Sequence, residues 1–356
     1  MTVVGPRAWG LVPWRLQPGP QNTICDVPGI RVGHRTLRTD GPCTARTGVT
    51  VVLPDAGLPA ERLAAAAFVF NGTGEMTGLL QVNEWGALET PVALTGTAAL
   101  PAVLQGLARH MFERSEALGR TMAPCLPVVA ECNDMWLSDA RCCPVQPDDA
   151  LRAIADASAA QAAWGSVGAG TGMVSFGFKG GVGSASRIVS PAGETYALGA
   201  VCLVNFGQPG DLVVAGRSVG HLPGEADRRR HAPPPDGSLV TVLATDAPLD
   251  HHALRRIAAR APLAMARVGG YGRHGSGDLF LAFSTVPQRE RPDVAWSSRP
   301  VLRSDLLNDF FLAAVEATEE AILSALFHAT DETGLLGRRI LALPEAEVGR
   351  RVRGGA

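Results

Sequence analysis

The segment at residues 198–207, LGAVCLVNFG, constrains the fold more than any other because it is almost wholly apolar. A β-strand with one face in water alternates apolar and polar residues, whereas a strand covered on both faces is a continuous apolar run. A chain with such a strand needs a layer of structure above it and another below it. We therefore expect a layered molecule with a sheet in its interior.

Strand-like and helix-like segments alternate along the rest of the chain. Short strands are predicted at 46–54, 125–131 and 172–178, and helices at 97–118, 147–165 and 304–328. The last helix has Ser304 as its expected N-cap and apolar residues at a spacing of about 3.6. The chain shows no internal repeat. Strands and helices joined by Gly-rich crossings predict a layered α/β protein.

Composition limits the domain organisation and the partners. A chain of 356 residues with 46% hydrophobic residues can form a sizeable core. We expect an irregular arm over residues 1–20, a single domain over 21–328 and a tail over 329–356. The net charge of −2 argues against nucleic acid or an anionic membrane as a partner.

Several common signals do not occur in the sequence. It has no signal-peptide pattern and no apolar run long enough to span a membrane. Its seven cysteines form no CxxC pair, which is typical of reduced thiols in a cytoplasmic protein. The glycines at 168–177 are out of phase for a dinucleotide fingerprint, and Lys179 is not in a phosphate-binding loop motif. We expect a cytoplasmic protein without a metal or cofactor.

An abrupt boundary lies between residues 221–237, HLPGEADRRRHAPPPDG, and the run SLVTVLAT that begins at Ser238. The first segment is charged and proline-rich, without aromatic or β-branched residues, and is expected to be an exposed, mobile loop. The second reads as a buried strand. A loop of this kind inside a compact domain is a natural place for cleavage of the chain.

Cleavage of the Gly237–Ser238 bond would give Ser238 a free α-amine. An α-amine has a pKa of about 7.7–8.0 and can accept the proton of the serine hydroxyl. Gly237 permits the strained backbone that attack on its own carbonyl requires. Two alternatives remain open: the Asp-Gly-Ser sequence is also compatible with an ordinary turn, and a Ser-His-Asp triad would need a positioned histidine that the sequence does not reveal.

Seven motifs together resemble one known family. They are CDVPGIRVGH (25–34), NGTGEMTGLLQVNEWGALETPVALTGT (71–97), FGFKGGVGSASR (176–187), VNFG (204–207), DGSLVTVLATDAPL (236–249), GSGDLFLAFST (275–285) and EATEEAILSAL (316–326). In this order they are similar to the DmpA-like aminopeptidases, which comprise L-aminopeptidase/D-Ala-esterase-amidases and β-aminopeptidases. The resemblance covers about residues 22–328.

The resemblance implies a fold, an activity and an assembly. The fold would be a four-layer αββα sandwich of the N-terminal-nucleophile-hydrolase type, shared with ornithine acetyltransferases. The chain would cleave itself into 1–237 and 238–356. The product would hydrolyse the N-terminal residue of small peptides, amino-acid amides or esters with a free amine, and would assemble as a tetramer of cleaved heterodimers.

Site residues follow from the same motifs. Ser238 would be the nucleophile and Gly237 would carry the scissile carbonyl. Asn205 would stabilise the oxyanion, a task suited to an amide N–H on a rigid strand. Ser276 would hydrogen-bond the amine or hydroxyl of Ser238, and Asp278, at a position where some members have Glu, would orient Ser276.

Two further residues would bind the substrate. Glu131 occupies the position of the carboxylate that receives the substrate ammonium, a charge-assisted contact that rejects blocked peptides. Asn133 stands where the better-studied members have a tyrosine in the oxyanion region. Asn133 can donate a hydrogen bond but lacks the aromatic wall, for which the nearby Trp136 is expected to compensate.

Two alternative functions remain. An acyltransferase of the ornithine acetyltransferase type would use the same machinery, but those relatives have threonine at the new N-terminus, and Ser238 argues against that branch. An uncleaved homologue would keep the fold without enzymatic activity.

Overall fold

The computed structural model describes residues 4–11, 13–160, 162–219, 222, 237–288 and 301–354. Of the loop expected over 221–237, only Leu222 and Gly237 fall within these ranges. The exposure and mobility predicted for the other residues of that loop lie outside the described residues.

A six-stranded sheet forms the centre of the molecule, in the order β4-β3-β14-β13-β10-β9. Its strands are β3 (Arg62–Gly72), β4 (Ala87–Leu88), β9 (Gly181–Val189), β10 (Tyr196–Asn205), β13 (Ser238–Thr245) and β14 (Gly277–Gln288). β13 pairs in parallel with β14 and antiparallel with β10. The apolar run at 198–207 supplies most of β10, which is buried from Ala197 to its end, as expected for a strand covered on both faces.

A four-stranded sheet, in the order β1-β2-β5-β6, packs against it. Its strands are β1 (Ile30–Thr39), β2 (Ala45–Pro54), β5 (Val92–Gly96) and β6 (Val128–Cys132). β5 and β6 are parallel, and the other pairs are antiparallel.

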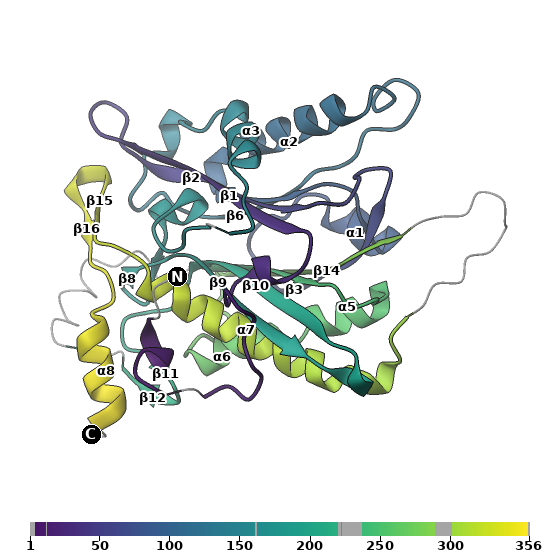
Figure 1. Cartoon of the computed structure of the whole chain (residues 1–356). Helices are drawn as coiled ribbons and strands as arrows, with labels where there is room; N and C mark the ends of the chain where they lie inside the picture. The colour runs from purple at the N-terminus through teal and green to yellow at the C-terminus, as the bar shows by residue number, and fades with distance from the viewer. Residues whose placement is uncertain are drawn as a thin grey trace.

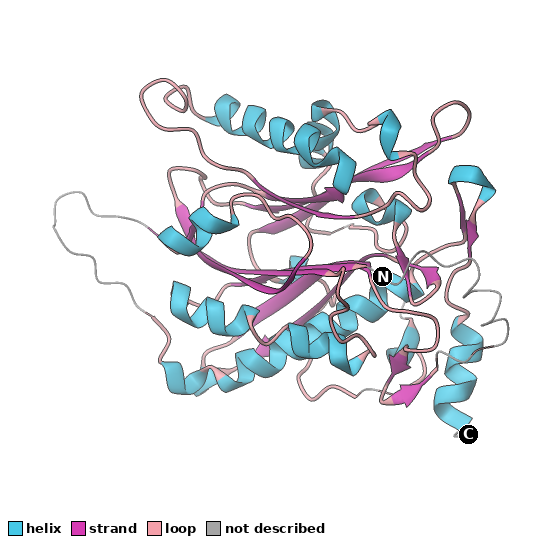
Figure 2. Cartoon of the chain, turned by 180° about the vertical axis from the view of Figure 1, so that it is seen from behind, coloured by secondary structure: helices cyan, strands magenta, loops and turns pink. Residues whose placement is uncertain are grey.

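Helices cover the outer face of each sheet (Figure 1). α2 (Leu100–Arg114) and α3 (Pro147–Ala155) lie over the four-stranded sheet. α5 (His251–Ala258), α6 (Pro262–Arg267) and α7 (Asn308–Phe327) lie over the six-stranded sheet. Figure 2 shows the same four layers from behind. The predicted αββα sandwich is therefore confirmed.

Three apolar clusters fill the spaces between the four layers. One joins α5 and α7 to the six-stranded sheet, with Leu239 and Leu243 of β13 among its members. A second lies between the sheets and includes Val240 and Val242 of the same strand. The third joins α2 and α3 to the four-stranded sheet. Successive residues of β13 thus point into different cores, because side chains alternate between the faces of a strand.

The remaining elements are short or peripheral. The other helices and strands are α1 (Leu79–Trp85), β7 (Val174–Ser175), β8 (Phe178–Lys179), β11 (Val213–Val214), β12 (Arg217–Ser218), β15 (Glu332–Thr333), β16 (Arg339–Ile340) and α8 (Glu345–Gly354). Short 3-10 turns are η1 (Gly5–Arg7), η2 (Ile24–Asp26), η3 (Thr97–Ala99), η4 (Ala140–Cys142), η5 (Gly168–Gly172), η6 (Pro191–Gly193), η7 (Ser304–Leu306) and η8 (Leu335–Gly337). Within the described part of the chain, no helix combines the length and apolar character needed to cross a membrane.

The structure corrects several local expectations. The helix expected over 147–165 ends at Ala155, as α3. Residues 172–178 do not form one strand: Phe176 and Gly177 have φ values of 53° and 73° and turn the chain into the β7–β8 hairpin. The helix expected from a Ser304 cap begins later, because residues 304–306 form a 3-10 turn and Leu307 occupies the N-cap position of α7.

Candidate active site

Ser238 is the first residue of β13, near the middle of the six-stranded sheet. Its side chain is largely buried, with a residue exposure of 7%. The backbone N–H of Gly277, at the start of the neighbouring strand β14, donates to Ser238 Oγ at 3.2 Å. The parallel pairing of the two strands therefore fixes the hydroxyl at one end of the sheet.

Gly237 precedes Ser238 at a point where the backbone has no room for a side chain. A Cβ atom on Gly237 would lie 2.1 Å from the carbonyl oxygen of Asn205 and 2.9 Å from Cα of Phe206. Any other residue would force this segment away from β10. The peptide bond between Gly237 and Ser238 is thus held closely against the end of β10.

Asn205 ends β10 and is the direct antiparallel partner of Ser238. Its side-chain amide is held at both ends: Oδ1 accepts from the backbone N–H of Val174 at 2.9 Å, and Nδ2 donates to the carbonyl of Asn133 at 3.0 Å. A primary amide has two N–H groups. Because one Nδ2 hydrogen is directed at Asn133, the second is the one that can donate a hydrogen bond to a substrate oxygen.

Ser276 and Asp278 flank Gly277 at the start of β14. Ser276 Oγ donates to Asp278 Oδ1 at 2.7 Å, and the backbone N–H of Leu239 donates to the same oxygen at 3.2 Å. Burial raises the pKa of the Asp278 carboxyl to about 6, against the lowering effect of these two hydrogen bonds. Among the described hydrogen bonds, Ser276 thus contacts Asp278, and the donor to Ser238 is the backbone of Gly277.

Glu131 lies in β6, in the other sheet, and its carboxylate is nearly buried. Oε1 accepts from the backbone N–H of Glu75 at 3.0 Å, and Oε2 accepts from the hydroxyl of Thr97. Gly74 lies between Glu131 and Gly277, since a Cβ atom on Gly74 would lie 3.1 Å from Cα of Gly277 and 3.4 Å from Oε1 of Glu131. The carboxylate therefore faces the Ser238 end of the sheet.

Asn133 reaches the site through its backbone. Its carbonyl accepts from Asn205, whereas its exposed side chain accepts from the backbone N–H of Met135 at 3.0 Å in a local turn. The ring of Trp136 stacks on Arg338 at 4.0 Å and packs against a small cluster that includes Val174. That Trp136 compensates for the missing aromatic wall stays a prediction. Tyr271, 62% exposed, lies in a small depression that Gly237 and Ser276 also line.

The sequence did not point to three parts of this site. Gly277 and Val174 act through backbone N–H groups, which carry no signal of residue type. Tyr271 could have been noticed as an aromatic residue in the Gly-rich stretch 269–277. Among the described residues, no group of three or more His, Cys, Asp or Glu side chains is arranged to hold a metal ion.

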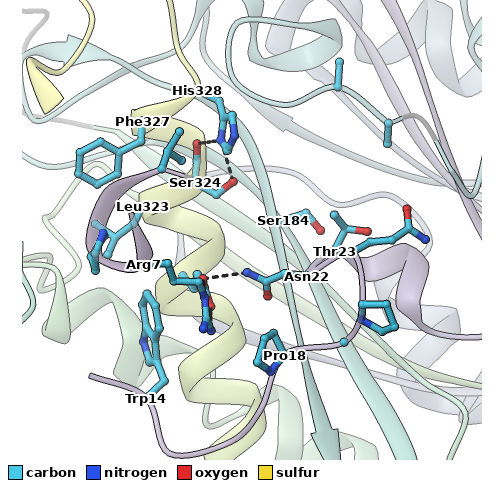
Figure 3. A pocket seen from close by; sticks show the side chains of 18 of the residues that line it. Arg7, Trp14, Pro18, Asn22, Thr23, Ser184, Leu323, Ser324, Phe327 and His328 are labelled. Atoms are coloured by element: carbon cyan, nitrogen blue, oxygen red, sulfur yellow. Dashed lines mark hydrogen bonds and ion pairs between the residues drawn. The ribbon is translucent and has the colours of Figure 1, made fainter. Parts of the chain in front are cut away.

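A cavity of about 710 Å³ lies elsewhere, between the N-terminal arm and α7 (Figure 3). Arg7 and Glu320 form a salt bridge on its wall, and Asn22 donates to the same carboxylate at 2.8 Å. His328 and Ser324 contact each other on another part of the wall. Neither Ser238 nor Asn205 lines this cavity, so it is separate from the site described above.

Comparison with known proteins identifies the family of the chain. Residues 22–340 match the model of Peptidase family S58. The beta-peptidyl aminopeptidase BapA of Sphingosinicella microcystinivorans is 39% identical, over 97% of this chain and 91% of the relative. The chain belongs to peptidase family S58.

Solved structures extend the S58 assignment to the fold. A beta-aminopeptidase from a Burkholderia species superimposes with a TM-score of 0.88 at 37% identity and covers 99% of both chains. The L-aminopeptidase D-Ala-esterase/amidase of Ochrobactrum anthropi gives a TM-score of 0.90 at 32% identity, again over 99% of both chains. The latter is described as a prototype of the serine aminopeptidases with a variant of the Ntn hydrolase fold.

This S58 member is therefore a hydrolase of the serine aminopeptidase class with the Ntn-type fold. The resemblance to the DmpA-like family inferred from seven motifs is confirmed. The matched region extends twelve residues beyond the expected boundary at 328, into the β15–β16 hairpin.

Proposed function

We propose that this S58 peptidase cleaves its own Gly237–Ser238 bond and then uses Ser238 as an N-terminal nucleophile. The observation that supports this most strongly is the close approach of Gly237 to Asn205 beside the hydroxyl of Ser238. It supports the proposal because the Gly237 carbonyl, the Ser238 hydroxyl and the Asn205 amide meet at one strand end, where they would act as scissile carbonyl, nucleophile and oxyanion donor. The other site residues surround this point.

Self-cleavage would proceed by an N-to-O acyl shift. Ser238 Oγ attacks the Gly237 carbonyl carbon and transfers its proton to the departing amide nitrogen, so that an ester bond replaces the peptide bond. Water then hydrolyses the ester. The products are a carboxylate on Gly237 and a free amine and hydroxyl on Ser238.

Substrate hydrolysis would repeat the acyl transfer on an external carbonyl. The α-amine of Ser238 takes the hydroxyl proton as Oγ attacks, and Asn205 Nδ2 donates to the developing oxyanion. The proton then passes to the leaving group, and water releases the acyl group from Ser238. Asp278 would hold Ser276 in position beside the amine.

The substrate would carry a free amine at its first residue. Glu131 has a buried carboxylate that lies next to Gly74, which in turn packs against Gly277 beside Ser238; this supports an ammonium-binding role for Glu131. Asn133 would contribute to the oxyanion region through its carbonyl contact with Asn205. Two relatives are named for β-peptides or as a β-aminopeptidase, so we place β-alanyl amides and short peptides first among the substrates.

We also propose a cytoplasmic tetramer of cleaved heterodimers. All seven cysteines are free thiols, which supports a reducing compartment. Size-exclusion chromatography with light scattering tests the assembly. A monomeric heterodimer at micromolar concentration would contradict it.

Denaturing electrophoresis and one variant test the central proposal. Freshly purified protein should give two bands near two-thirds and one-third of the full mass, and Ser238→Ala should give one full-length band. The wild type should hydrolyse at least one of the p-nitroanilides of L-, D- and β-alanine, and the variant none of them. Splitting of the Ser238→Ala chain would instead indicate an external protease and would refute self-cleavage.

A further inference from the structure

Lys179 is a fully buried lysine that the chemistry above does not use. It lies in β8, has no solvent exposure, and its Nζ donates to the carbonyls of Gly170 at 2.8 Å and Gly180 at 3.0 Å. A buried ammonium normally pairs with a carboxylate. In the described part of the chain its hydrogen bonds go to backbone carbonyls instead.

The charged groups around Lys179 leave it without a carboxylate of its own. Burial lowers the pKa of Lys179 to about 7, Glu332 raises it in part, and Arg38 lowers it further. Glu332 itself is shared between Arg38 at 2.9 Å and Arg46 at 2.8 Å. Burial of the ammonium without a carboxylate partner is unfavourable for the stability of the folded chain. Its two hydrogen bonds therefore have a role other than stabilising the fold.

Those two hydrogen bonds close a loop of the backbone. Gly170 belongs to η5 and Gly180 directly precedes β9, so the β7–β8 hairpin lies between the two carbonyls that Lys179 holds. The backbone N–H of Gly180 also donates to the carbonyl of Met173 at 2.8 Å. Lys179 therefore anchors both ends of the hairpin from inside.

The same hairpin holds the side chain of Asn205. Val174, the cross-strand partner of Lys179, donates its backbone N–H to Asn205 Oδ1 at 2.9 Å. The next residue, Ser175, donates its hydroxyl to the carbonyl of Phe206 at 2.6 Å. A Cβ on Gly180 would lie 2.3 Å from the carbonyl oxygen of Val204, so this end of the hairpin is pressed against β10.

We propose that Lys179 is a positioning residue for Asn205. Its ammonium fixes the hairpin so that the Val174 N–H holds Oδ1, and Nδ2 therefore faces the substrate carbonyl. If the Asn205 amide were flipped by 180°, Oδ1 would face the oxyanion, and the two oxygens would repel each other. This inference rests on the proposed oxyanion role of Asn205.

A double-mutant cycle tests the coupling. The variants are Lys179→Met, Asn205→Ala and the double variant, with kcat and KM measured per cleaved chain. Loss of one oxyanion donor lowers kcat by about 10²- to 10³-fold, so Lys179→Met should lower it by roughly 10- to 100-fold with little change in KM. In the Asn205→Ala background, Lys179→Met should have almost no further effect on kcat. Equal losses in both backgrounds would overturn the proposal.

Phe178→Leu is the matched control, because Phe178 is the other residue of β8 and its side chain packs in the core between the helices and the six-stranded sheet. It should lower the melting temperature, and any effect on kcat should be the same in both backgrounds. If Lys179→Met cannot be obtained folded, Lys179→Gln replaces it in the same cycle.

A crystal structure tests the positioning role of Lys179 without an activity assay. In a crystal structure of Lys179→Met in the Ser238→Ala background, we expect Asn205 Oδ1 to lie more than 3.5 Å from Val174 N, or in two conformers. An unchanged contact near 2.9 Å would overturn the proposal. This result stands even if the wild type hydrolyses no substrate, an outcome that would refute the proposed function alone.

Discussion

Ser238 lies directly opposite Asn205 in the antiparallel pairing of β13 with β10. Opposed residues in such a pair have Cα atoms about 4.5–5.5 Å apart. The pleat fixes which face each side chain occupies, so a slip of one residue would send Asn205 to the other side of the sheet. Strand register is therefore what aligns the Ser238 hydroxyl with the Asn205 amide.

Gly237→Ala should destabilise the uncleaved chain, because the new Cβ would lie 2.1 Å from the carbonyl oxygen of Asn205. Overpacking of this kind costs about 1–3 kcal/mol. We expect the free energy of unfolding to fall by that amount when Gly237→Ala is added to Ser238→Ala, as measured by denaturant titration. In the chain that keeps Ser238, cleavage followed on a gel should slow.

Gly57→Ala is the control for that experiment. The nearest atom to its added Cβ is the carboxylate end of Glu61, at 3.4 Å, which is an ordinary van der Waals distance. It should change stability little. Equal stability of the Gly237→Ala and Gly237 chains would show that β10 does not restrict this position.

Glu131→Gln should weaken the enzyme's selection for a free amine. The amide can keep the contacts with Glu75 N and the Thr97 hydroxyl but carries no charge. Hydrogen bonds to charged groups contribute about 1.5–3 kcal/mol, so kcat/KM for the free-amine substrate should fall roughly 10- to 100-fold. Steady-state assays with free and N-acetylated substrates measure this change.

The expected loss for Glu131→Gln is mainly an increase in KM. Glu113→Gln, on the exposed surface of α2, is the matched control and should leave both constants unchanged. A variant at Glu131 that retained wild-type kcat/KM and still rejected acetylated substrates would contradict the ammonium-binding role.

Asp278→Asn should change how stability depends on pH. Burial raises the pKa of Asp278 from 3.8 to about 6, so the folded chain binds a proton more readily than the unfolded chain. This group thus favours folding below about pH 4, and the contribution disappears as pH rises through about 6. The melting temperature of Asp278→Asn, relative to wild type, should therefore increase between these pH values.

Calorimetry across this range measures the difference. Burial also raises the pKa of Asp134 to about 6, but that carboxyl is present in both proteins and its effect cancels. Parallel melting curves across the range would show that Asp278 titrates near its ordinary value in the folded chain.

Residue type and pattern predicted the fold because the decisive signals were local. The apolar run at 198–207 required coverage on both faces, and β10 has it. The strand after residue 237 begins at Ser238, as expected. The seven motifs identified the family because they occur along this chain in the same order as in the family.

Features that depend on backbone geometry could not be predicted in the same way. The stretch 172–178 has strand-forming residues, yet positive φ values at Phe176 and Gly177 fold it into a hairpin. The acidic residues of α7 are typical of a solvated face, but Glu316 and Glu320 are buried against Arg187. Tertiary pairing of this kind overrides local preference.

The strand order of the six-stranded sheet limits whether the two proposed chains can fold separately. β13 and β14 follow the cleavage point but lie between β3 and β10, which precede it. Neither product would contain the complete six-stranded sheet, and each would expose unpaired strand edges if made alone. Separately expressed halves should therefore aggregate when they are not mixed during folding. Swapping one half between homologues should succeed only where both strand interfaces match.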